Sequence, residues 1–150
     1  MMQRAKDLIH RTVHGVREST PLSEVYKLLK RYNIRHLPVT GDGGEAAGII
    51  SDRDLLLQAS PDDRSSFPPH LKARDVMTPD PISCPAGTPL CDIAATMKAC
   101  RIDSILIVEG TKMAGIVTST DIMQAYVEEM TQKGKRPMPF NTRLNRKQAS

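Results

Sequence analysis

Residues 48–54 read Gly-Ile-Ile-Ser-Asp-Arg-Asp, and residues 115–121 read Gly-Ile-Val-Thr-Ser-Thr-Asp. The flanking sequence repeats as well, because Thr20-Pro21-Leu22 returns as Thr88-Pro89-Leu90, 68 residues later. Past the middle of the unit the spacing falls to 67, which indicates that the second copy has lost one residue in a turn. Self-similarity at a fixed period indicates one structural unit that is used twice.

A helix is expected near the start of each copy. In the first copy it covers residues 21–32, with Thr20 as the N-cap and Pro21 at the first helical position. The second copy starts in the same way at residues 88–89. The side chains expected on the buried stripes are Leu22, Val25, Leu28, Leu29 and Tyr32 in the first helix, and Leu90, Ile93, Met97 and Cys100 in the second.

Each helix is followed by two short apolar runs that predict a β-hairpin. The runs are residues 36–40 and 46–50 in the first copy, and 104–108 and 113–117 in the second, separated by glycine-containing turns. Further helices are expected over residues 52–59 and 119–130, and short extended stretches over 13–16 and 82–84. The pattern predicts the order β-α-β-β-α for each copy.

The fold class predicted is therefore α/β (α+β), with two such repeats packed in pseudo-two-fold symmetry. The repeats are expected over residues 1–59 and 73–130, joined by a Pro- and Ser-rich linker over 60–72 and followed by a tail over 131–150. Units of about 55 residues are marginal alone, so they are expected to share an interface.

Composition narrows the class of protein further. No run of 18 apolar residues and no secretory leader is visible, which predicts a cytoplasmic protein without a membrane partner. The three cysteines, Cys84, Cys91 and Cys100, form no CxxC pair and are expected to be small core residues. The histidines lack metal-ligand spacing, and no catalytic motif is found, so neither a metal site nor an enzyme is predicted.

The positive charge is concentrated in the tail. Residues 131–150 contain six Lys and Arg residues and no acidic residue, whereas the whole chain has a net charge of +4. The body of the chain therefore carries −2. A flexible, solvated tail is expected, and attraction of nucleic acid is the alternative that such a tail leaves open.

The repeated Gly-x-x-Ser/Thr-x-x-Asp element stands where a strand meets a helix. Its glycine lets a ligand or another backbone approach, and its hydroxyl, from Ser51 or Thr118, falls at the helix N-terminus, which favours an anion. The carboxylates of Asp54 and Asp121 suit a ribose diol. Helix capping for stability alone is the alternative interpretation, but the three residues recur together at identical spacing.

These residues, together with Asp7-Leu8-Ile9, Asp75-Val76-Met77 and the run 34–39, resemble the tandem CBS (cystathionine-β-synthase) domain, or Bateman module. The resemblance implies adenosine-ligand pockets between the repeats, a homodimer, and a regulatory role signalled to a separate effector protein. It implies that Ser51 and Thr118 contact phosphate and that Asp54 and Asp121 contact ribose. The residues before each middle strand are implied to line the pockets: Ile34, Arg35 and His36, and Ile102, Asp103 and Ser104.

The two pockets are expected to differ in charge. Arg35 and His36 add a cation and a titratable ring to the first, which predicts that it is the better phosphate site. Asp103 adds no positive charge to the second, which is expected to take an uncharged or cationic adenosine derivative or to stay empty. The sequence leaves AMP, ADP, ATP and S-adenosylmethionine open as ligands, and a nucleic-acid-associated protein open as the alternative function.

Overall fold

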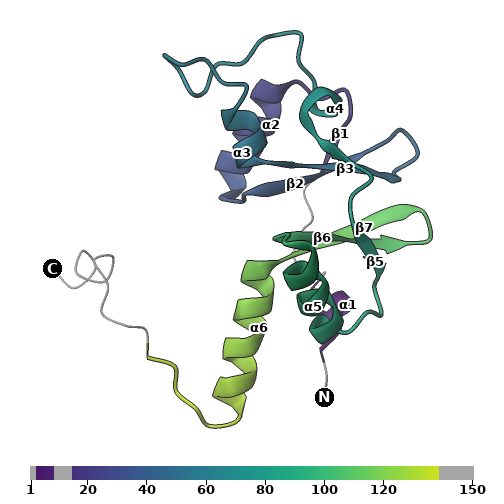
Figure 1. The fold of residues 1–150 in the computed structure, drawn as a ribbon, viewed down its shortest axis with the longest axis vertical. Helices are drawn as coiled ribbons and strands as arrows, with labels where there is room; N and C mark the ends of the chain where they lie inside the picture. The colour runs from purple at the N-terminus through teal and green to yellow at the C-terminus, as the bar shows by residue number, and fades with distance from the viewer. Residues whose placement is uncertain (1–2, 9–14, 139–150) are drawn as a thin grey trace, which may run out of the picture. The chain divides into compact units, whose positions relative to one another are not determined.

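The computed structural model describes residues 3–8 and 15–138 of the 150-residue chain. The chain divides into two compact units, one ending at Ser119 and one beginning at Thr120. Figure 1 shows the elements, whose bounds are α1 Ala5–Leu8, β1 Val16–Arg17, α2 Leu22–Tyr32, β2 His36–Thr40, β3 Ala46–Ser51, α3 Asp52–Leu56, α4 Ala73–Val76, β4 Thr78–Pro79, β5 Ser83–Pro85, α5 Leu90–Cys100, β6 Ser104–Glu109, β7 Lys112–Thr118 and α6 Ser119–Gln132.

The predicted order β-α-β-β-α is confirmed in both repeats, as β1-α2-β2-β3-α3 and β5-α5-β6-β7-α6. In each repeat the first strand pairs in parallel with the second, and the second pairs antiparallel with the third. Residues 13 and 14 of the first predicted extended stretch lie outside the described residues. The sheet of the first repeat also gains β4 at its edge, giving the strand order β1-β2-β3-β4.

The two hairpins have the same register, apart from the deletion that the spacing predicts. His36 lies opposite Ser51, and Ser104 lies opposite Thr118. The pairs Thr40–Ala46 and Val108–Met113 are equivalent, and five residues separate the first pair whereas four separate the second. The missing residue is therefore in the turn, as expected.

Helix α2 buries most of the stripe that its sequence predicts. Leu22, Val25 and Leu29 are buried against the first sheet, and Leu28 is partly buried. Two expectations were wrong. Pro21 is the N-cap and Thr20 lies before it, accepting a hydrogen bond from the Arg17 N–H at 3.1 Å, because this contact closes the preceding turn instead of capping the helix.

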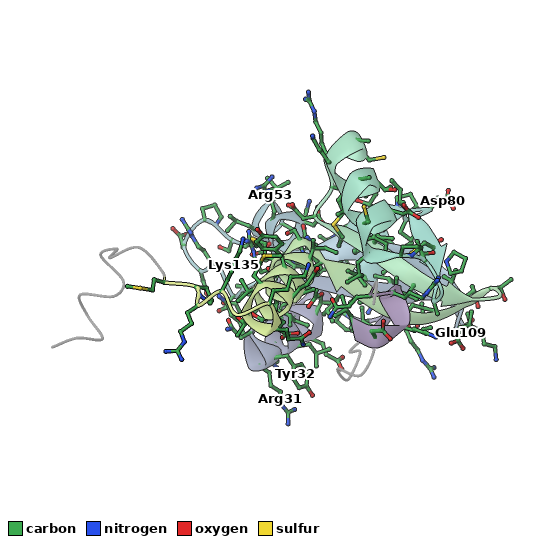
Figure 2. The ribbon with its side chains drawn as sticks, turned by 90° about the horizontal axis from the view of Figure 1, so that it is seen from below. Arg31, Tyr32, Arg53, Asp80, Glu109 and Lys135 are labelled. Atoms are coloured by element: carbon green, nitrogen blue, oxygen red, sulfur yellow. The ribbon has the colours of Figure 1, made fainter. Side chains whose placement is uncertain are left out.

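The second wrong expectation for this helix concerns its last turn. Tyr32 is 37% exposed, and Figure 2 shows that it projects outward together with Arg31, whose guanidinium lies 5.7 Å from the Tyr32 ring centroid. The helix ends immediately afterwards at Asn33, which has a left-handed conformation (φ 50°). Asparagine tolerates this conformation better than most residues, so the chain turns away before Tyr32 can reach the core.

Helix α5 repeats this design and corrects the prediction for the cysteines. Leu90, Ile93 and Met97 are buried as expected, but Cys91 and Cys100 are exposed and Cys84 is only partly buried. The chain leaves α5 at Arg101, again with a left-handed conformation (φ 54°). Cys100 therefore occupies the final turn, beyond the part of the helix that packs on its sheet, as Tyr32 does in α2.

The linker between the repeats packs on the first repeat. Phe67 and Leu71 lie against the core formed by residues such as Leu37 and Ile50, and the Phe67 ring is 5.5 Å from that of Tyr26. Ala73, the first residue of α4, is fully buried in the same core. The second repeat thus begins with a helix that is packed into the first.

The short helices α1 and α4 are exchanged between the repeats. The Ala73 and Arg74 N–H groups donate to the Thr20 and Glu18 carbonyls, at 2.8 and 3.0 Å. In the second repeat the equivalent bonds come from the other end of the sequence, since Ala5 and Lys6 of α1 donate to the Thr88 and Ala86 carbonyls at 2.9 Å. Each repeat is therefore completed by a segment that precedes the other in the sequence.

Gly48 in β3 is approached by another part of the backbone. The sequence left open whether a ligand or a backbone segment would approach this glycine. A Cβ atom built at Gly48 would lie 2.8 Å from the Thr78 carbonyl oxygen and 2.5 Å from the Met77 sulfur. The carbonyl belongs to β4, which pairs with β3 at this position. Glycine here is needed for close packing of the sheet edge.

We expect Gly48→Ala to destabilise the protein by about 1–3 kcal/mol, because β3 and β4 must separate to admit a methyl group. The free energy of unfolding from urea denaturation measures this effect. Gly87→Ala is the matched control, since nothing lies within 4 Å of the position its Cβ would occupy. An equal effect of the two substitutions would contradict the packing role of Gly48.

Candidate functional site

The first site is built at the junction of β3 and α3, where Ser51 and Asp54 form a capping box. The Ser51 hydroxyl accepts from the Asp54 N–H at 3.2 Å, and Asp54 Oδ2 accepts from the Ser51 N–H at 2.7 Å. The capping interpretation therefore describes what these side chains do without a ligand. The other oxygen, Asp54 Oδ1, accepts no hydrogen bond from the residues that the structure describes. It can therefore accept one from a ligand hydroxyl.

Helix α3 is shorter than predicted. It ends at Leu56 instead of Ala59 and spans five residues, because Leu56 and Leu57 are exposed and give the following turn no apolar contact. A helix of this length has few aligned peptide dipoles. The dipole at its N-terminus therefore contributes little to holding an anion, and the nearby side chains must supply the attraction.

Arg35 and His36 lie beside this junction. The Asp52 N–H donates to the Arg35 carbonyl at 3.0 Å, which brings the start of α3 back to the residue before β2. The Arg35 guanidinium Nε lies 3.5 Å from Asp52 Oδ2, and the two side chains are 76% and 51% exposed. An ion pair this exposed is weak, so Arg35 can exchange Asp52 for another anion at low cost.

His36 is partly buried, and charged side chains of both repeats change the pKa of its imidazole. Burial lowers the pKa of its imidazole, and Arg35 also lowers it, whereas Asp52, Asp103 and Asp54 act in the opposite direction. The net effect is a pKa below its ordinary value, so the ring is largely neutral at pH 7. Because the unfolded chain then binds the proton more readily, His36 reduces the stability of the fold as the pH falls through its ordinary titration range.

The second copy of the element has matching backbone geometry. Thr118 is the last residue of β7, and Asp121 is in the first turn of α6. The Ser119 N–H donates to the Asp103 carbonyl at 2.9 Å, as the Asp52 N–H does to Arg35 in the first copy. Thr118 belongs to the first compact unit and Asp121 to the second.

Ile34 and Ile102 hold equivalent places before the middle strands. Each is partly buried, and each N–H donates at 3.0 Å to a carbonyl of the preceding helix, that of Leu29 or Met97. Ser104 begins β6, as His36 begins β2. These contacts fix the backbone at Ile34 and Ile102, two of the six positions that were expected to line the pockets.

Two features of the site were not found from the sequence. Asp52 was not selected, although it directly follows Ser51 and is the ion-pair partner of Arg35. The influence of Asp103 on His36 was also missed, because it joins two residues that are 67 positions apart. The place of Asp52 at the start of α3 could have been recognised from the sequence, whereas the contact between repeats depends on packing.

The described part of the chain offers no group of three His, Cys, Asp or Glu side chains arranged to hold a metal ion. Burial raises the pKa of the partly buried Cys84 thiol. Among the described helices, none combines the length and apolar character needed to cross a membrane. Of the basic tail, residues 131 and 132 belong to α6 and are not an extension, and residues 139–150 lie outside the described residues.

The architecture and the doubled site define a tandem pair of one small domain. The family model of the CBS domain matches residues 5–60 and 73–128. The chain therefore belongs to the CBS-domain family.

Relatives of known sequence include proteins of similar size. A CBS domain-containing protein of Dictyostelium discoideum is 25% identical over 131 residues, which are 82% of this chain and 90% of that protein. The uncharacterized protein YlbB of Bacillus subtilis is 29% identical over 125 residues, covering 81% and 80%. L-aspartate semialdehyde sulfurtransferase of Methanocaldococcus jannaschii is 25% identical over 122 residues, but the chain spans only 23% of its length.

Solved structures show the same fold. A CBS domain pair in complex with 5′-methylthioadenosine and S-adenosyl-L-methionine has a TM-score of 0.73 and 23% identity, covering 86% of this chain and 99% of its own. CBSX2 in complex with AMP has a TM-score of 0.72 and 24% identity, covering 85% and 98%. The CBS domain of a membrane protein from Sphaerobacter thermophilus has a TM-score of 0.73 and 24% identity, covering 82% and 87%.

Proposed function

We propose that this protein is a regulatory module that binds an adenosine compound and signals its presence to a separate partner protein. The observation that carries the proposal is the convergence of Ser51, Asp54, Arg35 and His36 at one strand-to-helix junction of a CBS domain. The sequence element of this junction recurs at residues 115–121. Solved neighbours in complex with AMP, or with S-adenosyl-L-methionine and 5′-methylthioadenosine, support an adenosine ligand.

In the first site, Asp54 accepts hydrogen bonds from the ribose hydroxyls, and Ser51 and Arg35 contact the phosphate. Asp54 Oδ2 is held by the Ser51 N–H, so the carboxylate is oriented before a ligand arrives. Thr118 and Asp121 are proposed for the same roles, because the sequence element of the first site recurs at residues 115–121. The adenine ring lies against Ile34 or Ile102, both of which are partly buried.

Signalling requires that the ligand bind one arrangement of the protein better than another. Because the site contains groups from both repeats, a bound ligand changes the energy of their contact. AMP, ADP and ATP would make the module a sensor of cellular energy state, and S-adenosylmethionine would make it a sensor of methyl supply. The proposed location is the cytoplasm, where these compounds are present.

A homodimer is the proposed assembly. Leu56 at the end of α3 is 52% exposed, and Leu57 directly after the helix is 77% exposed. Met123 and Tyr126 on α6 are 60% and 63% exposed. Exposed apolar side chains that cluster on a helix are typical of interaction surfaces. Leu57→Glu should therefore convert a dimer into a monomer in size-exclusion chromatography with light scattering.

The proposed ligand site is tested with Asp54→Asn and a panel of AMP, ADP, ATP, adenosine and S-adenosylmethionine in a thermal shift assay. The amide oxygen can still accept from the Ser51 N–H, so the cap is largely kept, but the charged acceptor for ribose is lost. We expect affinity for the preferred ligand to fall about 10- to 100-fold. Calorimetric titration measures the change, and Asp62→Asn on the exposed linker is the matched control.

Unchanged affinity of Asp54→Asn would contradict the role of this carboxylate. The absence of any shift with the whole panel would contradict the proposed function itself. RNA binding that is sensitive to salt and lost on removal of residues 131–150 would then favour the nucleic-acid-associated alternative. Lys133, Lys135 and Arg136 of this segment are exposed, and Figure 2 labels Lys135.

A further inference from the structure

We propose that the first site takes up a proton when it binds a phosphorylated adenosine ligand. The proton is held by His36, whose imidazolium then attracts both the ligand phosphate and Asp103 of the second repeat. The proposal rests on the proposed function of the site. It adds a regulatory property, a preference for phosphorylated ligands that increases as the pH falls.

The position of His36 carries the first step of the argument. It is the first residue of β2 and lies opposite Ser51, the residue that caps α3. Its side chain is partly buried, unlike the exposed side chain of Arg35. A phosphate held by the Ser51 hydroxyl would therefore be close to an imidazole that is already fixed by the sheet.

The charges that reach His36 carry the second step. Asp52 and Asp54 come from the first turn of α3, Arg35 from the residue before β2, and Asp103 from the residue before β6 in the other repeat. Three carboxylates and one guanidinium thus act on His36, and the guanidinium is itself paired with Asp52. With a neutral imidazole, this group of side chains is net negative and repels a phosphate.

Protonation of His36 removes this conflict. Burial keeps the pKa of the ring below its ordinary value in the free protein, so the ring is largely neutral at pH 7. A phosphate adds a further negative charge beside the ring and raises its pKa. By linkage, a ligand that raises a pKa binds more tightly as the pH falls toward that range. Adenosine has no phosphate and should not show this dependence.

The charged ring also connects ligand binding to the second repeat. An imidazolium at His36 attracts the Asp103 carboxylate more strongly than a neutral ring does. The Asp103 carbonyl in turn accepts from the N–H of Ser119, the first residue of α6. The contact between repeats therefore becomes stronger only when the phosphate is present, which gives the module a difference in energy to signal.

The test compares AMP and adenosine as probes of the full-length protein, by calorimetric titration in buffers that differ in ionisation enthalpy. For the native protein, AMP affinity should rise about 3- to 10-fold from about pH 8 to about pH 6, with net proton uptake. Part of the measured proton uptake comes from the phosphate of AMP itself and should remain in His36→Gln. The part that comes from the protein should be lost in this variant. His70→Gln, which changes an exposed linker histidine, is the matched control and should behave as the native protein.

Asp103→Asn provides a second variant that keeps the imidazole. Removing this carboxylate lowers the pKa of His36 further, so the proton uptake with AMP should decrease. Equal proton uptake by the native protein and His36→Gln would overturn the proposal, and so would equal pH dependence for adenosine and AMP. In both cases adenosine-ligand binding would stand. If neither probe nor any other adenosine compound binds, the proposed function fails together with this inference.

Discussion

Ala5→Arg is expected to destabilise the second repeat, although residue 5 lies at the other end of the chain. Ala5 is fully buried, and its N–H donates to the Thr88 carbonyl at 2.9 Å. A guanidinium cannot be buried there without a partner, so α1 must leave its place. Three backbone hydrogen bonds are then lost, which join Gln3, Ala5 and Lys6 to the second repeat. At about 1 kcal/mol each, the expected loss is about 3 kcal/mol in the free energy of unfolding.

Hydrogen exchange can locate this effect. The Leu90 N–H donates to the Gln3 carbonyl at 3.0 Å, and in the first repeat the Leu22 N–H donates to the Leu71 carbonyl at 3.3 Å. Ala5→Arg should therefore speed exchange at Leu90, and Ala73→Arg, at the equivalent position, should speed exchange at Leu22. Leu90 should respond more strongly than Leu22 to Ala5→Arg, and Leu22 more strongly than Leu90 to Ala73→Arg. Equal responses of the two amides to each substitution would contradict the assignment of α1 to the second repeat and α4 to the first.

Lys6→Arg is the control for the first variant, because residue 6 is exposed and keeps its charge. It should leave both amides protected and the free energy of unfolding within about 0.5 kcal/mol of the native value. A loss equal to that of Ala5→Arg would show that side-chain bulk in α1, and not its burial, controls stability.

The exchange of α1 and α4 marks the limit of what the sequence could predict. The internal period of 68 residues located both copies of the opening segment, since Asp7 matches Asp75. Each carboxylate accepts a hydrogen bond from the backbone three residues earlier, that of Arg4 or Lys72. The local structure was thus encoded locally. The path of the linker decides which repeat α1 and α4 pack on. The periodicity of the sequence does not predict this path.

The same distinction applies to the site. Ser51 and Asp54 could be found because a hydroxyl and a carboxylate three residues apart have a fixed relation at a helix start, and the structure brings them together. The pairing of Arg35 with Asp52 and the influence of Asp103 on His36 join different elements. Such contacts arise only after the sheets and helices have packed, so residue spacing could not reveal them.

Burial errors at helix ends have a related cause. Periodicity treats a helix as continuing indefinitely, so it placed Tyr32 and Cys100 on the buried stripe. The left-handed residues Asn33 and Arg101 end these helices. Arginine is not a residue whose presence signals such a cap, so the end of α5 was less predictable than that of α2.

Leu37→Ala is expected to cost about 2–5 kcal/mol of stability, because Leu37 is fully buried in the central strand β2 and a cavity would remain. The equivalent residue in the second repeat is Ile105, which is 2% exposed in β6. Urea denaturation followed by circular dichroism measures both variants. Met138→Ala, at a side chain that is 88% exposed, should stay within about 0.5 kcal/mol of the native protein.

The comparison of Leu37→Ala with Ile105→Ala also tests whether the repeats unfold together. The first repeat is incomplete without α4, and the second is incomplete without α1. The two hairpins are also joined directly, because the Met113 N–H donates to the Gly44 carbonyl at 3.0 Å. A cavity in either sheet should therefore move one shared transition to lower urea, with the slope m unchanged. Two separate transitions, only one of which responds to each substitution, would mean that the exchanged helices hold the repeats side by side without coupling their folding.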